Sequence, residues 1–303
     1  MKILVTGSNG LLGQKLVRLL DADAGIDLVA TARKQLSISL GRGSFSILDI
    51  TDKQDVIDCL QRHQPDIVIN TAAMTQVDQC ETDKEACWQA NVTAVAYLVE
   101  ACEKINAHLI HISTDFIFDG SHGPLTEEEP AKPVNYYGES KLAGEQVVKR
   151  SSIKWTIIRT VLVYGITSDL SRSNIVLWVK NSLENRKEIN VVNDQWRTPT
   201  LAEDLAMGCY LAAKEKATGV YHASGEEMMT PYDIAVKTAQ YFKLDTSLIH
   251  ATDSTKFKQP AARPLTTGFD ITKAKKQLGY KPHTFTEGLA ILADQIQQLS
   301  SKK

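Results

Sequence analysis

The sequence predicts an α/β protein built on a doubly wound parallel sheet, with a smaller α/β lobe made from later segments. The first half alternates short, almost wholly apolar runs with longer helical patterns. Such runs are typical of parallel strands buried on both faces, and the alternation predicts right-handed crossovers between them. The apolar runs lie at 3–5, 28–30, 67–69, 109–112 and 155–158, and the helical patterns at 11–20, 53–62, 81–104 and 136–149.

The alternation weakens after Gly165, which suggests where the main domain ends. We expect residues 1–165, together with about 200–224, to form the main domain. Residues 166–199 and 225–303 then form the smaller lobe. The later elements that we expect are helices at 172–185, 201–214, 231–242 and 285–299 and strands at 189–192 and 219–223.

Composition excludes several classes of function. The chain has 303 residues, of which 43% are hydrophobic, and a net charge of -2, so it offers no electrostatic case for binding nucleic acid or an anionic membrane. It contains neither a run of about 18 apolar residues nor a secretory signal. Five scattered cysteines favour reduced thiols in a cytoplasm, and no residue spacing suggests a metal site.

A glycine-rich turn follows the first strand directly. Gly7, Gly10 and Gly13 are spaced G-x-x-G-x-x-G, which lets the backbone turn tightly and lets the start of the helix approach a ligand. Exposed N–H groups and the positive end of the helix then face a pyrophosphate. The turn predicts a site for a nicotinamide dinucleotide, with contacts from Gly7, Ser8, Asn9, Gly10, Leu11 and Leu12.

The end of the second strand favours NADP(H). An acidic residue there would bind the ribose hydroxyls of NAD, but this chain has Arg33, followed by Lys34, and no acid. A planar guanidinium suits a 2′-phosphate, although two solvated cations would look the same, and NAD(H) remains the alternative. A further strand just before Asp49 counts as the third, so the runs at 67–69 and 109–112 are the fourth and fifth strands. Asp49 and Ile50 after the third strand are expected at the adenine. The segment after the fourth strand supplies Ala72, Ala73 and Met74 to the cofactor and Thr75 to the substrate.

A tyrosine and a lysine four residues apart predict the proton chemistry. Tyr137 and Lys141 share a helix face, so the ammonium is expected to lower the tyrosine pKa. A phenol tuned in this way can protonate a carbonyl oxygen as hydride arrives at the carbon. A hydroxyl of the segment Ile112–Asp115, at the carboxyl end of the fifth strand, is well placed to hold the same oxygen.

Together these motifs resemble the extended short-chain dehydrogenase/reductases, which share a Rossmann-type sheet. Four further segments are similar to the dTDP-4-dehydrorhamnose reductase branch, the enzymes of dTDP-rhamnose biosynthesis. These are Ser113–Gly120, Tyr137–Lys141, Val192–Gln195 and the pair Arg263-Pro264. The resemblance implies that residues 1–165 bind NADP and that the lobe binds a nucleotide sugar.

The resemblance also implies individual roles. Thr114, with Ser113 as a weaker alternative, would orient the C4 carbonyl, and Tyr137 would donate the proton. Lys141 would bind the nicotinamide ribose, and Asn91 would place Lys141 or a relay water. The substrate residues expected beside Thr75 are Phe116, Gln195, Arg197 and Arg263. The two arginines are expected to bind phosphate oxygens, unless both pair with acids of the lobe.

Two departures from the branch lie where the sugar is expected. Phe116 stands where the branch usually has tyrosine, and Val161-Leu162 stands where a tryptophan is common. Phe116 also replaces the glutamate of the related 4,6-dehydratases, so water elimination lacks its expected base.

The leading interpretation is an NADPH-dependent reductase of a 4-keto sugar nucleotide. The alternatives are a nucleotide-sugar 4-epimerase and a non-catalytic NADP-binding partner subunit similar to the methionine adenosyltransferase beta subunit. The oligomeric state stays open between a monomer and a homodimer.

Overall fold

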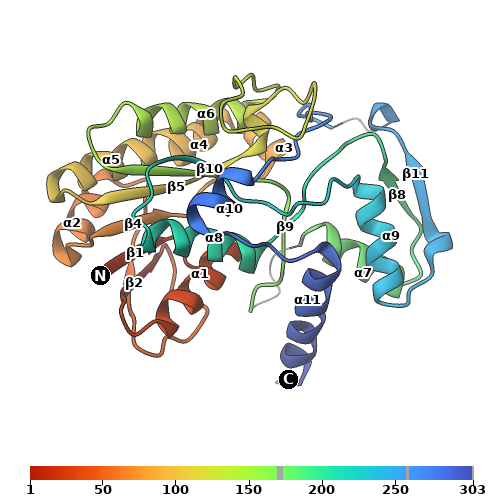
Figure 1. Cartoon of the computed structure of the whole chain (residues 1–303), viewed down its shortest axis with the longest axis horizontal. Helices are drawn as coiled ribbons and strands as arrows, with labels where there is room; N and C mark the ends of the chain where they lie inside the picture. Colours follow the sequence, from red (N-terminus) through yellow and green to blue (C-terminus); the bar gives the residue numbers. More distant parts are fainter. Residues whose placement is uncertain (169–172, 257–258, 302–303) are drawn as a thin grey trace.

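A computed structural model describes residues 1–168, 173–256 and 259–301, and it confirms the doubly wound α/β class (Figure 1). Seven parallel strands form the central sheet in the order β10-β6-β5-β4-β1-β2-β3. The strand order reverses between β1 and β4, which opens a crevice at their carboxyl ends. The strands are β1 (Lys2–Thr6), β2 (Asp27–Ala32), β3 (Ser44–Ile47), β4 (Ile67–Asn70), β5 (His108–Thr114), β6 (Trp155–Thr160) and β10 (Gly219–His222).

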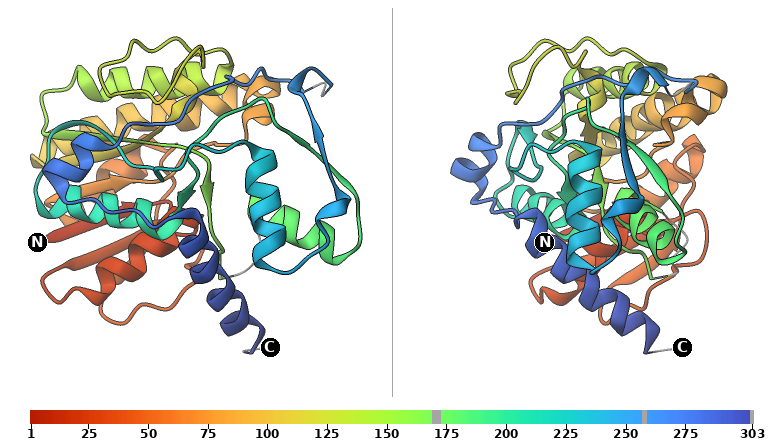
Figure 2. Two further views of the ribbon diagram at one scale, coloured as in Figure 1. Left: turned by 45° about the vertical axis from the view of Figure 1, so that its right-hand side comes forward. Right: turned by 90° about the vertical axis from the view of Figure 1, so that its right-hand side faces the viewer.

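Helices cover both faces of this sheet (Figures 1 and 2). The helices α1 (Leu11–Ala22) and α8 (Ala202–Lys214) pack on one face, and α2 (Lys53–His63), α5 (Ala94–Ile105) and α6 (Tyr136–Lys149) on the other. In β1, Ile3 and Val5 pack into the core under α1 and α8, and Leu4 packs into the core under α2, α5 and α6. This two-sided burial explains why the strands appear in the sequence as continuous apolar runs.

The single helix predicted at 81–104 is wrong, because the structure divides this region. Asp83 ends α3 (Val77–Thr82) and caps α4 (Lys84–Trp88), accepting a hydrogen bond from the Ala86 N–H. One turn of π-helix, η1 (Gln89–Thr93), then connects α4 to α5. Such turns often occur at functional sites, and this one carries Asn91.

The smaller lobe lies beside the main sheet (Figure 2). Its parallel strands β8 (Ile189–Val192) and β11 (Ile249–Thr252) pack against α7 (Ile175–Glu184) and α9 (Pro231–Tyr241). The predicted start of α7 at residue 172 lies outside the described residues. The remaining elements are η2 (Asp115–Ile117), β7 (Val163–Tyr164), β9 (Thr200–Leu201), η3 (Thr246–Leu248), η4 (Ser254–Lys256), α10 (Thr272–Leu278) and α11 (Phe285–Ser300).

Within the described ranges, no helix combines the length and the apolar character needed to cross a membrane.

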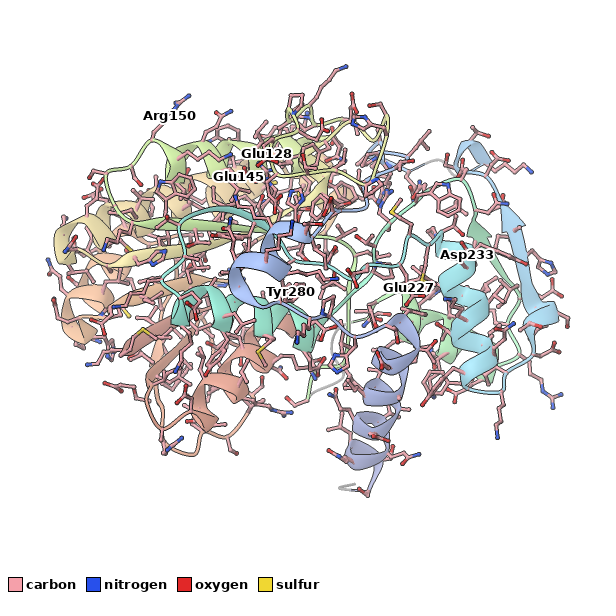
Figure 3. All side chains as sticks on the ribbon, viewed as in Figure 1. Glu128, Glu145, Arg150, Glu227, Asp233 and Tyr280 are labelled. Atoms are coloured by element: carbon pink, nitrogen blue, oxygen red, sulfur yellow. The ribbon has the colours of Figure 1, made fainter. Side chains whose placement is uncertain are left out.

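A buried ion pair fixes α6 to the sheet. Both Glu145 oxygens accept hydrogen bonds from the Arg159 guanidinium at 2.9 Å, and Lys149 adds a contact at 2.8 Å. Glu145, labelled in Figure 3, is fully buried. Burial by itself raises the pKa of Glu145, but the hydrogen bonds and charge of Arg159, with Lys149, hold it at about 2. The pair therefore stabilises the fold above the unfolded pKa near 4.5 and loses its effect as the pH falls toward 2.

We expect Glu145→Gln to lower the free energy of unfolding at pH 7 by about 3–5 kcal/mol, because it leaves a buried guanidinium without its counter-charge. Urea titration measures the change. The matched control Lys149→Gln removes only the partly exposed partner and should cost no more than about 1 kcal/mol. Equal losses for the two variants would contradict the assignment, as would a Glu145→Gln deficit that does not shrink between pH 5 and pH 2.

Candidate active site

The turn between β1 and α1 has the form of an anion site. Gly7 has φ +69°, and a Cβ added there would lie 2.8 Å from the Ala72 backbone nitrogen. A Cβ on Gly13 would lie 2.2 Å from the Gly7 carbonyl oxygen, so this glycine lets the helix pack on the turn. Helix α1 begins after Gly10 without a side-chain cap and without an acidic residue in its first turn. Its first N–H groups, at Leu11 and Leu12, are therefore available to an anion.

The side chains of Ser8 and Asn9 bind the protein backbone. The Ser8 side chain is buried and donates to the Val5 carbonyl. Asn9 binds the loop after β2: its amide donates to the Gln35 carbonyl at 3.0 Å, and its oxygen accepts from the Ser37 N–H at 2.9 Å. This loop carries Arg33, which is exposed and forms no ion pair with any residue that the structure describes.

The other residues expected at the cofactor follow β3 and β4. Asp49 is half-buried, and one of its oxygens accepts from the Thr51 N–H at 3.0 Å, while Ile50 beside it is buried. Ala72, Ala73 and Met74 lie partly exposed at the end of β4, opposite the glycine turn, and Thr75 follows them at the surface.

Asn91, on the π-helical turn η1, forms several side-chain hydrogen bonds. Its side-chain oxygen accepts from the Met74 N–H at 2.9 Å, and its amide donates to the Met74 carbonyl at 3.0 Å. The same amide lies 3.0 Å from the Ser140 hydroxyl. Asn91 therefore binds the loop after β4 to α6. Its expected contact to Lys141 does not occur in this structure.

Thr114 and Tyr137 meet at the carboxyl end of β5. The Tyr137 ring is buried and packs edge-on against Phe116, with 5.6 Å between ring centroids. Burial raises the pKa of Tyr137 above its usual value of 10, and interaction with the Thr114 side chain opposes that shift. Thr114 also caps η2, accepting from the Phe116 N–H at 3.3 Å.

The expected lowering of the Tyr137 pKa by Lys141 is wrong for this structure. The Lys141 ammonium is buried and donates to the Ile112 carbonyl at 2.6 Å, on the sheet side of α6. Desolvation, not the ammonium, then dominates the pKa of the phenol. Burial also lowers the pKa of Lys141 to about 8.

Four of the expected substrate residues line one pocket, and one of them, Phe116, packs against the Tyr137 ring. Gln195, Arg197 and Arg263 come from the lobe and line a cavity of about 170 Å³, and the residues that complete it are Asp115, Phe116, Leu162 and Pro231. Segments that lie far apart in the sequence therefore converge beside Tyr137. Thr75 does not line this cavity.

Both arginines pair with acids, Asp115 and Asp78. These acids belong to residues 1–165, whereas the alternative interpretation expected acids of the lobe. Arg197 is buried, and its guanidinium donates to the carbonyls of Trp196 and Leu265. Its Nε lies 3.7 Å from a carboxylate oxygen of Asp115. Both terminal nitrogens thus bind backbone carbonyls of the protein, which disfavours a bidentate phosphate contact, and that contact of Arg197 stays a prediction. Arg263 pairs with Asp78 through two contacts of 2.7 and 2.8 Å at a partly exposed position.

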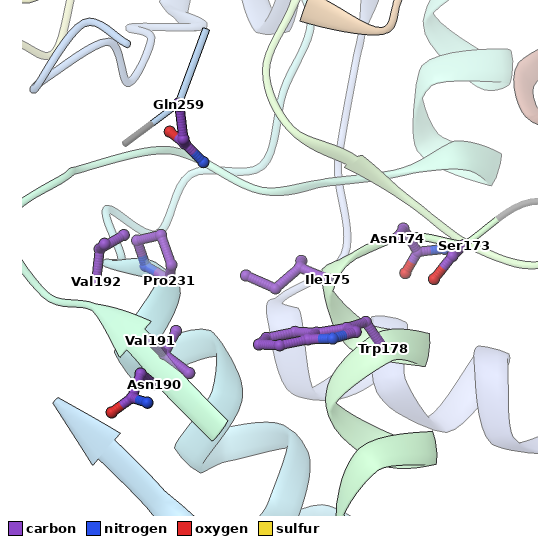
Figure 4. A pocket seen from close by; sticks show the side chains of 9 residues that line it. All are labelled: Ser173, Asn174, Ile175, Trp178, Asn190, Val191, Val192, Pro231 and Gln259. Carbon is purple, nitrogen blue, oxygen red and sulfur yellow. The ribbon is translucent and has the colours of Figure 1, made fainter. Parts of the chain in front are cut away.

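A larger cavity of about 450 Å³ adjoins the first (Figure 4). Ile175 and Trp178 of α7 line one side, and Val192 of β8 lies across from them. The Trp178 side chain is 40% exposed, so its ring offers a stacking surface. Pro231 lines both cavities. Sequence reasoning missed Trp178 and Pro231. A tryptophan on the polar side of an amphipathic helix could have indicated a ligand surface at Trp178.

The comparisons with known proteins agree with the expected resemblance. Residues 1–298 match the family described as RmlD substrate binding domain. A probable low-salt glycan biosynthesis reductase of Haloferax volcanii is 32% identical over 99% of this chain and 100% of its own. A dTDP-4-dehydrorhamnose reductase of Aggregatibacter actinomycetemcomitans is 31% identical over 95% and 97%. The mouse methionine adenosyltransferase 2 subunit beta is 30% identical over 90% and 81%.

Solved structures give the same result. A dTDP-4-dehydrorhamnose reductase of Clostridium acetobutylicum has a TM-score of 0.88 at 30% identity and covers 98% of this chain and 100% of its own. The enzyme of Bacillus anthracis, solved in complex with NADP, has a TM-score of 0.83 at 27% identity, with coverages of 97% and 99%. The chain therefore belongs to the RmlD substrate binding domain family, within the extended short-chain dehydrogenase/reductases.

Proposed function

We propose that this protein is an NADPH-dependent reductase of a 4-keto sugar nucleotide, similar to dTDP-4-dehydrorhamnose reductase. The observation that carries the proposal is the convergence of Thr114 and Tyr137 with a lobe pocket lined by Phe116 and Arg263. A cation for phosphate then lines the cavity, and the proton donor Tyr137 lies behind its Phe116 wall, next to the hydroxyl of Thr114. The family match supports the reductase class.

The glycine turn fits the pyrophosphate of a nicotinamide dinucleotide. The uncapped start of α1 supplies N–H donors, and the absence of a Cβ on Gly7 keeps the turn close to β4. Residues 7–12 would bind the pyrophosphate, Asp49 and Ile50 the adenine, and Arg33 the 2′-phosphate. Ala72, Ala73, Met74 and Asn91 would border the nicotinamide half. The bound cofactor supplies the hydride.

Tyr137 has the protonation state that reduction requires. Because burial raises its pKa, the phenol carries its proton at neutral pH and can give it to the carbonyl oxygen. Thr114 would hold that oxygen by a hydrogen bond, and Lys141 would bind the nicotinamide ribose. Ser113 is the alternative candidate for the role of Thr114, and its buried hydroxyl, which has no partner among the described residues, is free to bind an oxygen.

The two joined cavities suit a nucleotide sugar. The smaller one lies beside Tyr137 and would take the keto sugar, and the larger one offers Trp178 as a stacking surface for the base. The diphosphate would pass Pro231 and Arg263. On this assignment residues 1–165 and about 200–224 form the cofactor domain, and 166–199 and 225–303 form the substrate lobe.

Water elimination is disfavoured at this site. Phe116 occupies the position of the dehydratase glutamate, and Asp115 is buried in contacts with Thr267 and Arg197. A 4-epimerase would use the same Tyr137 and return the hydride. Such an enzyme would be purified with NAD(H) permanently bound, whereas the reductase must exchange its cofactor.

A partner-subunit role is the second candidate. The relation to the methionine adenosyltransferase beta subunit, and the apolar Phe116 and Leu162 at the sugar end, favour it. Co-elution with a methionine adenosyltransferase catalytic subunit, together with no NADPH oxidation on a panel of 4-keto sugar nucleotides, would select this candidate over the reductase.

We expect Tyr137→Phe to keep the fold and the cofactor affinity but to reduce turnover by roughly 10²–10⁴-fold, the usual contribution of a positioned general acid. NADPH oxidation with dTDP-4-dehydrorhamnose measures turnover, and fluorescence titration measures cofactor binding. Tyr136→Phe, on the neighbouring residue, is the matched control and should be near wild type. Undiminished turnover in Tyr137→Phe would remove this residue from the mechanism.

Arg33→Ala should weaken NADPH binding by about 1–3 kcal/mol, because it removes a charge-assisted contact to the 2′-phosphate. NADH binding should change little. Calorimetric titration of both cofactors measures the difference, with Arg42→Ala as the control, because Arg42 precedes β3 and contacts the end of α1, away from the glycine turn. If NADH binds wild-type protein as tightly as NADPH, or if Arg33→Ala affects both equally, Arg33 does not select the cofactor.

Arg263→Ala should weaken nucleotide-sugar binding by about 1.5–3 kcal/mol if this guanidinium binds the diphosphate. Asp78→Asn is the informative companion, since it releases the same guanidinium from its ion pair and should tighten binding. Both are titrated with dTDP in the presence of NADPH. Weaker binding in both variants would indicate that the ion pair only holds the loop, and the diphosphate would then be bound elsewhere.

A further inference from the structure

A row of buried polar side chains crosses the sheet beneath the candidate active site. Thr6 of β1 pairs in register with Asn70 of β4, and Asn70 pairs in register with His111 of β5. In-register residues of neighbouring strands lie side by side on one face of a sheet. All three are at most 1% exposed. The row begins at the glycine turn and ends 3.5 Å from the Lys141 ammonium, where His111 Nε2 lies.

The hydrogen bonds along this row determine how each group is oriented. The Ala72 N–H donates to the side-chain oxygen of Asn70 at 3.3 Å and lies 3.4 Å from the Thr6 hydroxyl, which itself donates to the same Asn70 oxygen at 2.6 Å. Since a backbone N–H can only donate, the atom that it meets is the oxygen. The Asn70 amide nitrogen therefore faces His111 Nδ1, at 3.2 Å, and donates to it.

A neutral His111 with an acceptor at Nδ1 must carry its proton on Nε2. Burial and the Lys141 charge lower the pKa of His111 well below 6.5, so the neutral ring is the relevant form. Its Nε2–H then faces Lys141 Nζ. An ammonium can only donate hydrogen bonds, so it cannot pair with this N–H. An amine has a lone pair that accepts a hydrogen bond from Nε2–H, and it still has N–H groups to donate to the Ile112 carbonyl.

We propose that His111 is a positioning residue that acts through Lys141: the row Thr6–Asn70–His111 fixes the imidazole with its proton on Nε2, and this N–H favours the amine form of Lys141. The proposal rests on the reductase function proposed above for its effect on turnover. Other charges act on the same lysine. Glu145 of the same helix and the thiols of Cys87 and Cys80 favour the ammonium, while burial opposes it.

The first experiment reads the tautomer directly. Two-bond ¹⁵N–¹H NMR on histidine-labelled, cofactor-free protein should show His111 protonated on Nε2, with the signal assigned by its loss in His111→Phe. A proton on Nδ1 would overturn the proposal. The tautomer is read from the wild-type protein, and sequential backbone assignment identifies the His111 signal if His111→Phe does not fold.

The second experiment titrates Lys141 by ¹³C NMR of its Cε, assigned with Lys141→Arg. In Asn70→Asp, a carboxylate replaces the donating amide. The imidazole then carries its proton on Nδ1, and its Nε2 lone pair accepts a hydrogen bond from the ammonium. The Lys141 pKa should rise by about one pH unit. His111→Phe, which removes the N–H, should raise it too. His108→Phe is the matched control, because His108 lies on the same strand but contacts Thr156.

The new charge of Asn70→Asp also acts on Lys141 through space, and the double variant with His111→Phe separates the two effects. If His111 transmits the change, the Asn70→Asp substitution should raise the Lys141 pKa less than half as much once the ring is phenyl. An equal rise would overturn the proposal. With NADPH and the keto sugar nucleotide, the alkaline limb of the kcat profile should move with the Lys141 pKa. Absence of turnover in wild type would contradict the proposed function alone, since both NMR results stand without it.

Discussion

The close seating of α6 against its neighbours is the constraint on which the rest of the site depends. A Cβ on Gly138 would lie 2.1 Å from the Phe116 carbonyl oxygen, and one on Gly144 would lie 2.5 Å from that of Asn91. These two positions let the helix approach the end of β5 and the π-turn at the same time. The buried pair of Glu145 and Arg159 then holds the helix to the sheet. Tyr137 and Lys141 are carried on this helix, so their positions follow from backbone contacts that larger residues would prevent.

The parts that could be predicted from the sequence are those with local causes. Apolar runs located β1 and β4, and glycine spacing located the turn at Gly7, because strand burial and turn geometry act over a few residues. The surroundings of Lys141 could not be predicted in this way. They depend on Ile112 and on the way in which burial outweighs a neighbouring charge. The pairing of Arg263 with Asp78, and the break of the helix at Asp83, likewise depend on chain segments that meet only after folding.

The two ends of the site differ in how closely they follow the family pattern. At the cofactor end, the turn at Gly7 and the clamp formed by Asn9 leave an ordered surface for a dinucleotide. At the proposed sugar end, Phe116 and Leu162 present apolar groups to the smaller cavity. A reductase and a partner subunit would share the first end. Their difference lies in whether an apolar wall beside Tyr137 still orients a sugar for hydride transfer.

Pro231 forms part of the wall between the two cavities. It lies at the start of α9, where Thr230 and Asp233 form a capping box, and the preceding Met229 exchanges two backbone hydrogen bonds with Arg197. The wall shared by the two cavities is therefore tied both to a helix terminus and to the strand segment that lines the smaller cavity. A ligand that fills both must span a distance set by the protein backbone. For the nucleotide sugar proposed above, this wall would select the length of the phosphate linker between the sugar and the base.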